Sequence, residues 1–101
     1  MRIFWHATYY ENLASILDNG LVPGIDGLVY MCETEYDAAK FLYVRQCKNI
    51  LTMEIKIYKK DESKIIETFD HNERFFKCKA FGYKGNIPLK NIKQFRKIEL
   101  D

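Results

Sequence analysis

Residues 1–44, MRIFWHATYYENLASILDNGLVPGIDGLVYMCETEYDAAKFLYV, decide the fold because they alternate between strand-like and helix-like patterns. The apolar and aromatic segment 1–7 predicts a strand. We expect a helix to begin at Thr8, because Thr8-x-x-Glu11 fits a capping box. Gly20 is a typical helix stop, and an apolar face precedes it at helical spacing, at Leu13, Ile16 and Leu17.

The second half of this stretch predicts another strand and another helix. Residues 28–32, LVYMC, form a short apolar run typical of a buried strand. Thr34 fits the N-cap of a helix of about twelve residues. The apolar face of that helix would consist of Ala38, Ala39, Phe41 and Leu42, and Val44 could extend it.

Strand patterns dominate the rest of the chain. Residues 50–58 alternate between apolar and polar side chains, which indicates a half-buried strand, and a charged turn follows at 59–63. Further strands are predicted at 64–69, 74–83 and 92–100. Early helices and late strands favour an α+β fold with a largely antiparallel sheet.

Composition limits the possible classes of protein. A chain of 101 residues, 48% of them apolar, is expected to form a single domain spanning 1–101. The net charge of +2 gives no whole-protein argument for binding nucleic acid or a membrane. Cys32, Cys47 and Cys78 are widely spaced, so we expect reduced thiols and no metal site. With no signal peptide pattern and no run of about 20 apolar residues, a soluble cytoplasmic protein without membrane contact is expected.

Four ring-bearing side chains in the first half are candidates for a binding site. His6 stands where a strand should end and a helix begin, so it could bond a ligand hydroxyl. The alternative is a half-buried histidine satisfied by a local carbonyl, and composition alone favours it. Tyr30 offers an apolar ring with a polar tip, although a core tyrosine is the commoner case. Tyr36 and Tyr43 project from nearly the same side of the second helix, where they could line a pocket or only fill space.

The second half offers two carboxylates and a mixed aromatic and basic strand. Glu73 precedes the aromatic strand, and Glu67 interrupts the apolar run 65–69. Either is a solvated surface charge or part of a site. The segment 75–84 interleaves Phe and Tyr with Lys, which could stack bases and hold phosphates, although an amphipathic strand with a basic outer face is commoner.

The order of these pieces resembles the ADP-ribosyltransferase superfamily. The resemblance rests on His6-Ala7-Thr8, then Asn12-Leu13-x-x-Ile16-Leu17-x-x-Gly20-Leu21, then Gly27-Leu28-Val29-Tyr30, then Ala38 or Ala39 with Tyr43. These are similar to the His-Gly-Ser/Thr strand end, Ile-Leu-x-x-Gly-Leu helix and Gly-x-Tyr-Phe-type strand of the diphtheria-toxin-like and poly(ADP-ribose) polymerase branch. The helix opening is also similar to DNA-modifying toxins of the superfamily. The match covers roughly residues 4–43.

The resemblance implies a mostly antiparallel split sheet with two early helices, and NAD as substrate. His6 would hold the ribose 2′-hydroxyl of NAD, and the backbone at Ala7 would bind the nicotinamide amide. Thr8 would line the same site. No metal is implied.

The resemblance also implies how the nicotinamide would be expelled. Tyr30 and Tyr43 would stack on the nicotinamide ring, and Tyr36 would line the site beside them. Glu73 would act as the catalytic carboxylate, with His6, by stabilising the positive charge that develops as nicotinamide leaves. Little acid or base catalysis is needed, because nicotinamide is already a cationic leaving group.

Three features depart from the family pattern. Ala7 replaces the usual glycine, and its methyl group narrows the expected nicotinamide site. Position 71, two residues before Glu73, is a histidine, so the Gln/Glu-x-Glu pair of other branches is absent. After Arg2 no arginine occurs in the first forty residues, so the arginine-anchored branches, including the RNA 2′-phosphotransferases, fit poorly.

Three functions follow as hypotheses. The first is a minimal ADP-ribosyltransferase, of the kind found in a toxin or phage effector, that transfers ADP-ribose to a protein or nucleic acid or hydrolyses NAD. The second is a non-catalytic protein of this fold that binds a partner protein or a nucleotide-like ligand. The third is a small nucleic-acid-binding protein that uses the aromatic and basic strand.

Overall fold

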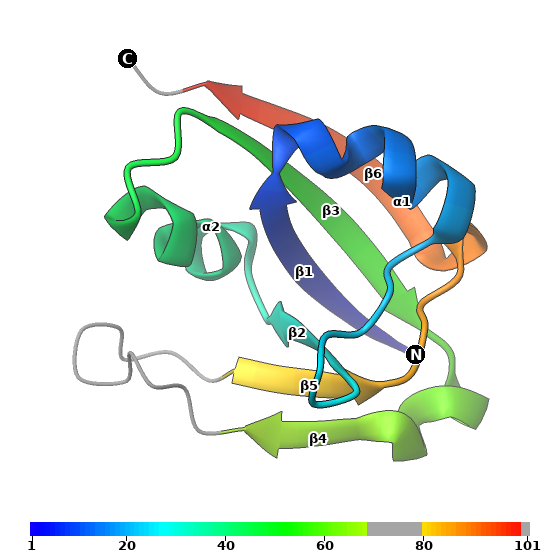
Figure 1. Ribbon diagram of the computed structural model, residues 1–101. Coiled ribbons are helices and arrows are strands. Elements are labelled where there is room, and N and C mark those ends of the chain that lie inside the picture. The colour runs from blue at the N-terminus through cyan, green and yellow to red at the C-terminus, as the bar shows by residue number, and fades with distance from the viewer. Residues whose placement is uncertain (69–79, 100–101) are drawn as a thin grey trace.

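The chain folds into one sheet with two α-helices packed on it (Figure 1). The computed structural model describes residues 1–68 and 80–99. Within these residues the strands are β1 (Arg2–Tyr9), β2 (Leu28–Cys32), β3 (Asn49–Ile57), β4 (Ile65–Thr68), β5 (Ala80–Lys84) and β6 (Ile92–Glu99). The helices are α1 (Leu13–Asn19), α2 (Glu35–Val44) and the short 3-10 segments η1 (Tyr10–Asn12), η2 (Lys59–Lys64) and η3 (Leu89–Asn91). The predicted α+β class is confirmed.

The sheet has the strand order β4-β5-β2-β1-β3-β6, and the pairings within it are antiparallel. β1 pairs with β3 along its whole length, from Arg2↔Ile57 to Tyr9↔Ile50. By contrast, β1 and β2 share the single register pair Trp5↔Cys32. The sheet therefore consists of two three-stranded halves that meet at one point and part on either side of it.

The two faces of the sheet are covered by different helices. Because side chains alternate along a strand, Phe4 and Met53 share one face with the main apolar core, to which α1 contributes Ile16. The opposite face is covered by α2, which buries Ala38, Ala39 and Leu42. Figure 1 shows α1 lying across the half of the sheet that contains β3 and β6. Each helix thus contributes an apolar stripe to a separate layer of the domain.

The first helix begins later than the sequence predicts. Thr8 belongs to β1, where it lies opposite Leu51, and α1 begins only at Leu13. The predicted capping box with Glu11 is therefore wrong, and the Thr8 hydroxyl instead accepts a hydrogen bond of 2.8 Å from Asn12 Nδ2. When β1 continues through Thr8, several backbone N–H and C=O groups form hydrogen bonds with β3. These bonds together stabilise the chain more than an N-cap does, which contributes about 1 kcal/mol.

Gly20 ends α1 as predicted, and the structure adds a reason for glycine. Its N–H donates to Ile16 O at 2.8 Å, and its φ of +72° lies in the region that favours glycine. A Cβ at this position would lie 2.5 Å from Ile87 O. The close approach arises because Leu21 and Ile87 form a β-bridge with two backbone hydrogen bonds of 2.9 Å. Leu17, predicted for the apolar face of the helix, is exposed.

The later elements largely follow the predictions. Thr34 caps α2 by accepting a 3.1 Å hydrogen bond from Asp37 N, and the helix runs for ten residues. The charged turn is η2, and β3, β4 and β6 lie within the predicted strand segments to within one or two residues. Of the predicted strand 74–83, residues 74–79 lie outside the described part of the chain. Within that part, Cys47 is a free thiol, and no helix is long and apolar enough to cross a membrane.

Candidate functional site

His6 lies in β1 one residue beyond the point where β1 and β2 meet. Its side chain is on the same face as Phe4, opposite Met53, and is half-buried. The imidazole reaches toward β2, and its Nδ1 lies 2.6 Å from the backbone oxygen of Tyr30. A side chain therefore joins the two halves of the sheet next to the place where their backbone pairing stops.

This contact determines which ring nitrogen of His6 carries the proton. A carbonyl oxygen can only accept, so Nδ1–H donates to Tyr30 O and Nε2 of the neutral ring is left as an acceptor. Burial lowers the pKa of His6, and the bond to the Tyr30 carbonyl offsets part of that effect. The ring is therefore neutral at pH 7 and offers Nε2 as an acceptor for a hydroxyl group.

Tyr30 lies in β2 opposite Gly82, and its side chain points to the face opposite Val29 and Met31. The residue is 49% exposed, and its hydroxyl donates a short hydrogen bond to Asp26 Oδ2. Asp26 Oδ1 also accepts from the backbone N–H of Leu28 at 3.0 Å. These bonds, that of Tyr30 first, lower the pKa of Asp26. The turn thus positions Tyr30. Its ring is half-exposed, and its backbone carbonyl accepts the hydrogen bond from His6.

Tyr36 and Tyr43 lie on α2, which follows β2 after two residues and packs against β1, β2 and β3. Tyr36 is exposed, and its ring has Lys40 Nζ 5.3 Å from the centroid. Tyr43 is half-buried. The backbone oxygen of Tyr30 contacts His6, but the Tyr30 ring points to the face of the sheet that α2 covers, and the His6 side chain points to the opposite face. Tyr36 lies next to Lys40, and Tyr43 shares the helix with Tyr36. Stacking of Tyr30 and Tyr43 on one ligand ring stays a prediction.

Ala7 and Thr8 follow His6 on opposite faces of β1 and are half-buried. Ala7 lies opposite Thr52, whose buried hydroxyl donates to Glu35 Oε2 at 2.8 Å. Arg96 donates to the other oxygen of Glu35 at 2.9 Å. This network joins the first turn of α2 to β3 and β6, and so fixes the helix over Ala7. Sequence analysis missed it, because a glutamate in the first turn of a helix is common without any such role.

The structure describes one of the two candidate carboxylates, Glu67. Glu73 lies outside the described residues and stays a prediction. Glu67 is exposed on β4, where it lies opposite Phe81. Since β4 is three strand spacings from β1 in the sheet, about 14 Å separate their axes. Glu67 is therefore away from His6.

Comparisons with known proteins add no family assignment. A search with family models finds no match to this chain, and a search of the curated proteins finds none either. Within residues 1–68 and 80–99, no three His, Cys, Asp or Glu side chains lie together in a way that could hold a metal ion. The functional argument therefore depends on the geometry of His6, Tyr30 and their neighbours.

Proposed function

We propose that this chain is a cytoplasmic ADP-ribosyltransferase that binds NAD at the split of the sheet and transfers ADP-ribose to a macromolecular acceptor. The observation that carries the proposal is the 2.6 Å contact between His6 Nδ1 and Tyr30 O. It supports a neutral imidazole whose Nε2 accepts from a ribose hydroxyl. The sequence resemblance also implies that His6 would hold a ribose hydroxyl, so the resemblance and the geometry support the same residue.

The neighbouring residues support the rest of the NAD site. Tyr30 has a half-exposed ring of the kind that stacks on nicotinamide, and its bond to Asp26 limits the orientations the ring can take. Tyr36 and Tyr43 belong to the helix that packs beside β2, and Tyr43 would supply the second stacking ring. Ala7 and Thr8 continue β1 past His6, where backbone groups would bind the nicotinamide amide.

The proposed reaction breaks the bond between C1′ of the ribose and the nicotinamide nitrogen. The bonding electron pair goes to the ring nitrogen, so nicotinamide departs as a neutral molecule. Positive charge develops at C1′, and Glu73 stabilises it electrostatically. A nucleophile of the acceptor, or water, then forms the new bond at C1′ and loses its proton to the solvent. The residues of this chain are needed to orient NAD and to exclude water.

The decisive test is release of nicotinamide from NAD by the purified protein. We expect release by the wild type and its loss in Glu73→Gln, because the amide cannot stabilise a cation as a carboxylate does. Glu67→Gln is the matched control and should keep full activity. Full activity of Glu73→Gln would remove Glu73 from the mechanism.

A non-catalytic binding protein is the second candidate, and Ala7 favours it. Its methyl group occupies the position of the family glycine, and α2 is fixed over this part of β1 by Glu35. On this hypothesis NAD or a related nucleotide raises the melting temperature, but no nicotinamide is released even with cell extract present as a source of acceptors. Release of nicotinamide that depends on Glu73 excludes it.

A further inference from the structure

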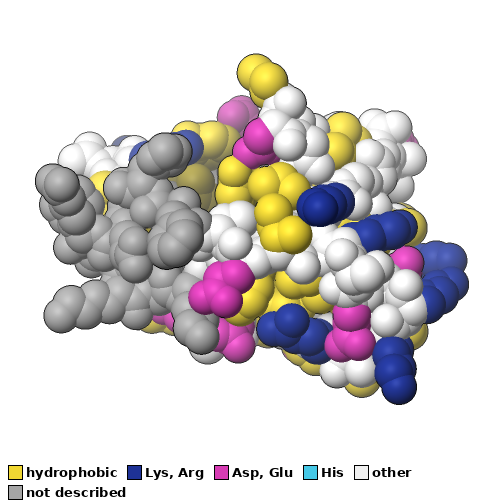
Figure 2. Space-filling model, turned by 90° about the horizontal axis from the view of Figure 1, so that it is seen from below, with side chains coloured by type: hydrophobic (Ala, Val, Ile, Leu, Met, Phe, Trp, Pro, Cys, Tyr) yellow, Lys and Arg dark blue, Asp and Glu magenta, His cyan; other side chains and the backbone are white. Residues whose placement is uncertain are grey.

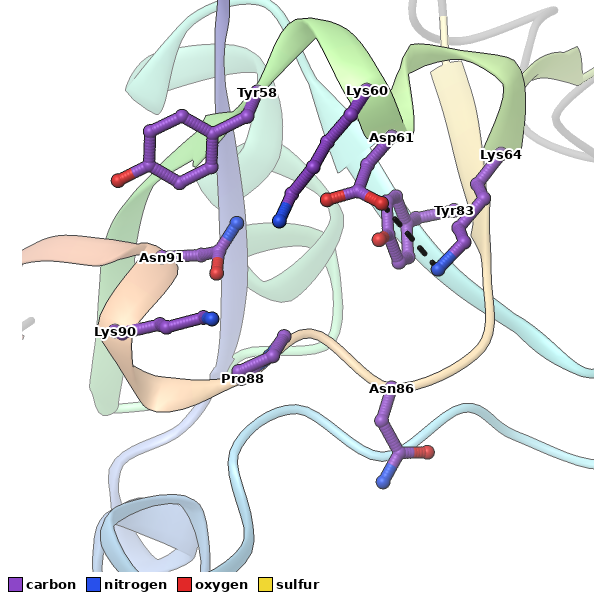
Figure 3. Close-up of a pocket in the computed structure, with 9 residues that line it drawn as sticks. All are labelled: Tyr58, Lys60, Asp61, Lys64, Tyr83, Asn86, Pro88, Lys90 and Asn91. Carbon is purple, nitrogen blue, oxygen red and sulfur yellow. Dashed lines mark ion pairs between the residues drawn. The ribbon is translucent and has the colours of Figure 1, made fainter.

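A cavity of about 450 Å³ lies at the opposite end of β1 from the His6 site, next to η2 and η3. Its size is within the range of small-molecule sites. Figure 3 shows the side chains around it, which come from the end of β3, both 3-10 segments, β5 and the loop after β5. They are Tyr58, Lys60, Asp61, Lys64, Tyr83, Asn86, Pro88, Lys90 and Asn91.

The cavity carries excess positive charge. Asp61 pairs with Lys64 at 3.6 Å, and Lys64 Nζ also lies 5.8 Å from the centroid of the Tyr83 ring. Within the described part of the chain, neither Lys60 nor Lys90 has an ion-pair partner. Figure 3 shows their amino groups on the same side of the cavity, with the amide of Asn91 between them. The amino groups of Lys60 and Lys90 therefore point into the same cavity, and no acidic side chain among the described residues neutralises either of them.

Backbone and side-chain bonds hold this arrangement in place. Asn91 is buried, and its Nδ2 donates to Lys56 O at 2.8 Å, which fixes η3 to β3. Its N–H donates to Pro88 O at 2.9 Å, and Asp61 N donates to Tyr58 O at the same distance. The two lysines therefore extend from fixed backbone positions, which reduces the entropy lost when an anion binds.

We propose that this cavity binds the phosphate of a nucleotide, carried either by a free nucleotide or by a strand of nucleic acid. Lys60 and Lys90 would neutralise the phosphate, because lysine is a common point-charge partner for phosphate groups. The half-buried ring of Tyr58 supplies an aromatic surface for the sugar or base. Figure 2 shows Lys and Arg side chains gathered on the side of the lower face where η2 lies, which attracts an anion toward the cavity.

This site is separate from the proposed NAD site. Tyr58 directly follows Ile57, which pairs with Arg2, and His6 lies four residues further along β1. Four residues of strand span about 13 Å. The proposal therefore does not depend on NAD binding at His6, and each site can be removed without changing the other.

The test compares the double variant Lys60→Gln/Lys90→Gln with Lys48→Gln/Lys93→Gln, which removes two exposed lysines outside the cavity. Fluorescence anisotropy measures binding of single strands of DNA and RNA of about ten nucleotides, and calorimetry measures binding of AMP. We expect the cavity variant to bind the ligand at least about tenfold more weakly than the control. For single-stranded nucleic acid, the slope of log K against log salt should fall by about 0.7, because the two lysines neutralise one phosphate.

The two ligand sources give different results in this test. Binding of the strands but not of AMP, lost in the cavity variant, supports a strand of nucleic acid as the source of the phosphate. Binding of AMP, lost in the same variant, supports a free nucleotide. If neither probe binds, or if both double variants bind equally well, the proposal is wrong. His6→Ala should leave this binding unchanged, and a loss in that variant would mean that the two sites are one.

Discussion

The substitution His6→Asn separates the contact that the imidazole makes with Tyr30 O from the NAD-binding role proposed for it. An asparagine amide has an N–H donor near the position of Nδ1, so it can still reach Tyr30 O. It has nothing at the position of Nε2. We therefore expect His6→Asn to keep most of the stability of the wild type and to lose affinity for NAD, whereas His6→Ala loses both.

The structure sets the size of each effect. The bond from Nδ1 to Tyr30 O is between neutral groups, so its net contribution is about 0.5–1.5 kcal/mol. His6→Ala should thus lower the free energy of unfolding by about 1 kcal/mol, or the melting temperature by about 4–8 °C. For NAD, losing one hydrogen bond of about 1 kcal/mol weakens binding about fivefold.

Thermal unfolding and calorimetric titration with NAD measure the two effects on the same samples. If His6→Asn is as unstable as His6→Ala, the bond to Tyr30 is not what His6 contributes to the fold. If a folded His6→Asn binds NAD as tightly as the wild type, Nε2 does not contact the ligand. Either outcome refutes the assignment of the two ring nitrogens.

Three further predictions follow from single positions. Burial lowers the pKa of His6 below 6.5, so as the pH falls the imidazole is protonated in the unfolded chain before it is protonated in the folded protein. The folded protein therefore loses stability as the pH falls below about 6.5. Urea unfolding from about pH 7.5 to about pH 5 should show a smaller loss in His6→Asn, and equal losses would contradict the burial of the imidazole. Gly20→Ala should destabilise the protein by at least about 1–2 kcal/mol in urea, because of its positive φ and the nearby Ile87 O, and unchanged unfolding would disprove that contact. Tyr30→Phe should raise the pKa of Asp26, measured by NMR titration, and should leave the affinity for NAD unchanged. If Tyr30→Phe loses as much affinity for NAD as Tyr30→Ala does, the hydroxyl and not the ring binds NAD.

The two helix boundaries that were predicted correctly depend on neighbours close in the chain. The N-cap at Thr34 needs only Asp37, and the helix stop at Gly20 needs only the preceding turn. Thr8 was misassigned because its capping pattern is equally local, while the partner that decides its structure, Leu51, lies in a strand far along the chain. A local sequence pattern can indicate an N-cap at Thr8, but it does not show that β3 pairs with this segment. The preference for a strand over a helix start at Thr8 was therefore not predictable from local sequence.

The same distinction holds for the functional residues. His6 and Tyr30 were both predicted as candidates, but the bond between them depends on where β1 and β2 part, which no local pattern indicates. Asp26 anchors the Tyr30 ring, and no sequence pattern indicates that contact. Lys60 and Lys90 are thirty positions apart, and only the fold brings them to one cavity.

The split of the sheet and the orientation of His6 have one physical cause. In a regular ladder the carbonyl of a residue such as Tyr30 accepts from a backbone N–H of the neighbouring strand. Here the imidazole N–H supplies that bond, so the strands part without leaving the carbonyl unpaired. The same bond fixes the ring so that Nε2 lies on the side away from Tyr30. A residue that allows the sheet to open therefore also presents an acceptor at the opening, so the binding role proposed for His6 need not compete with its structural role.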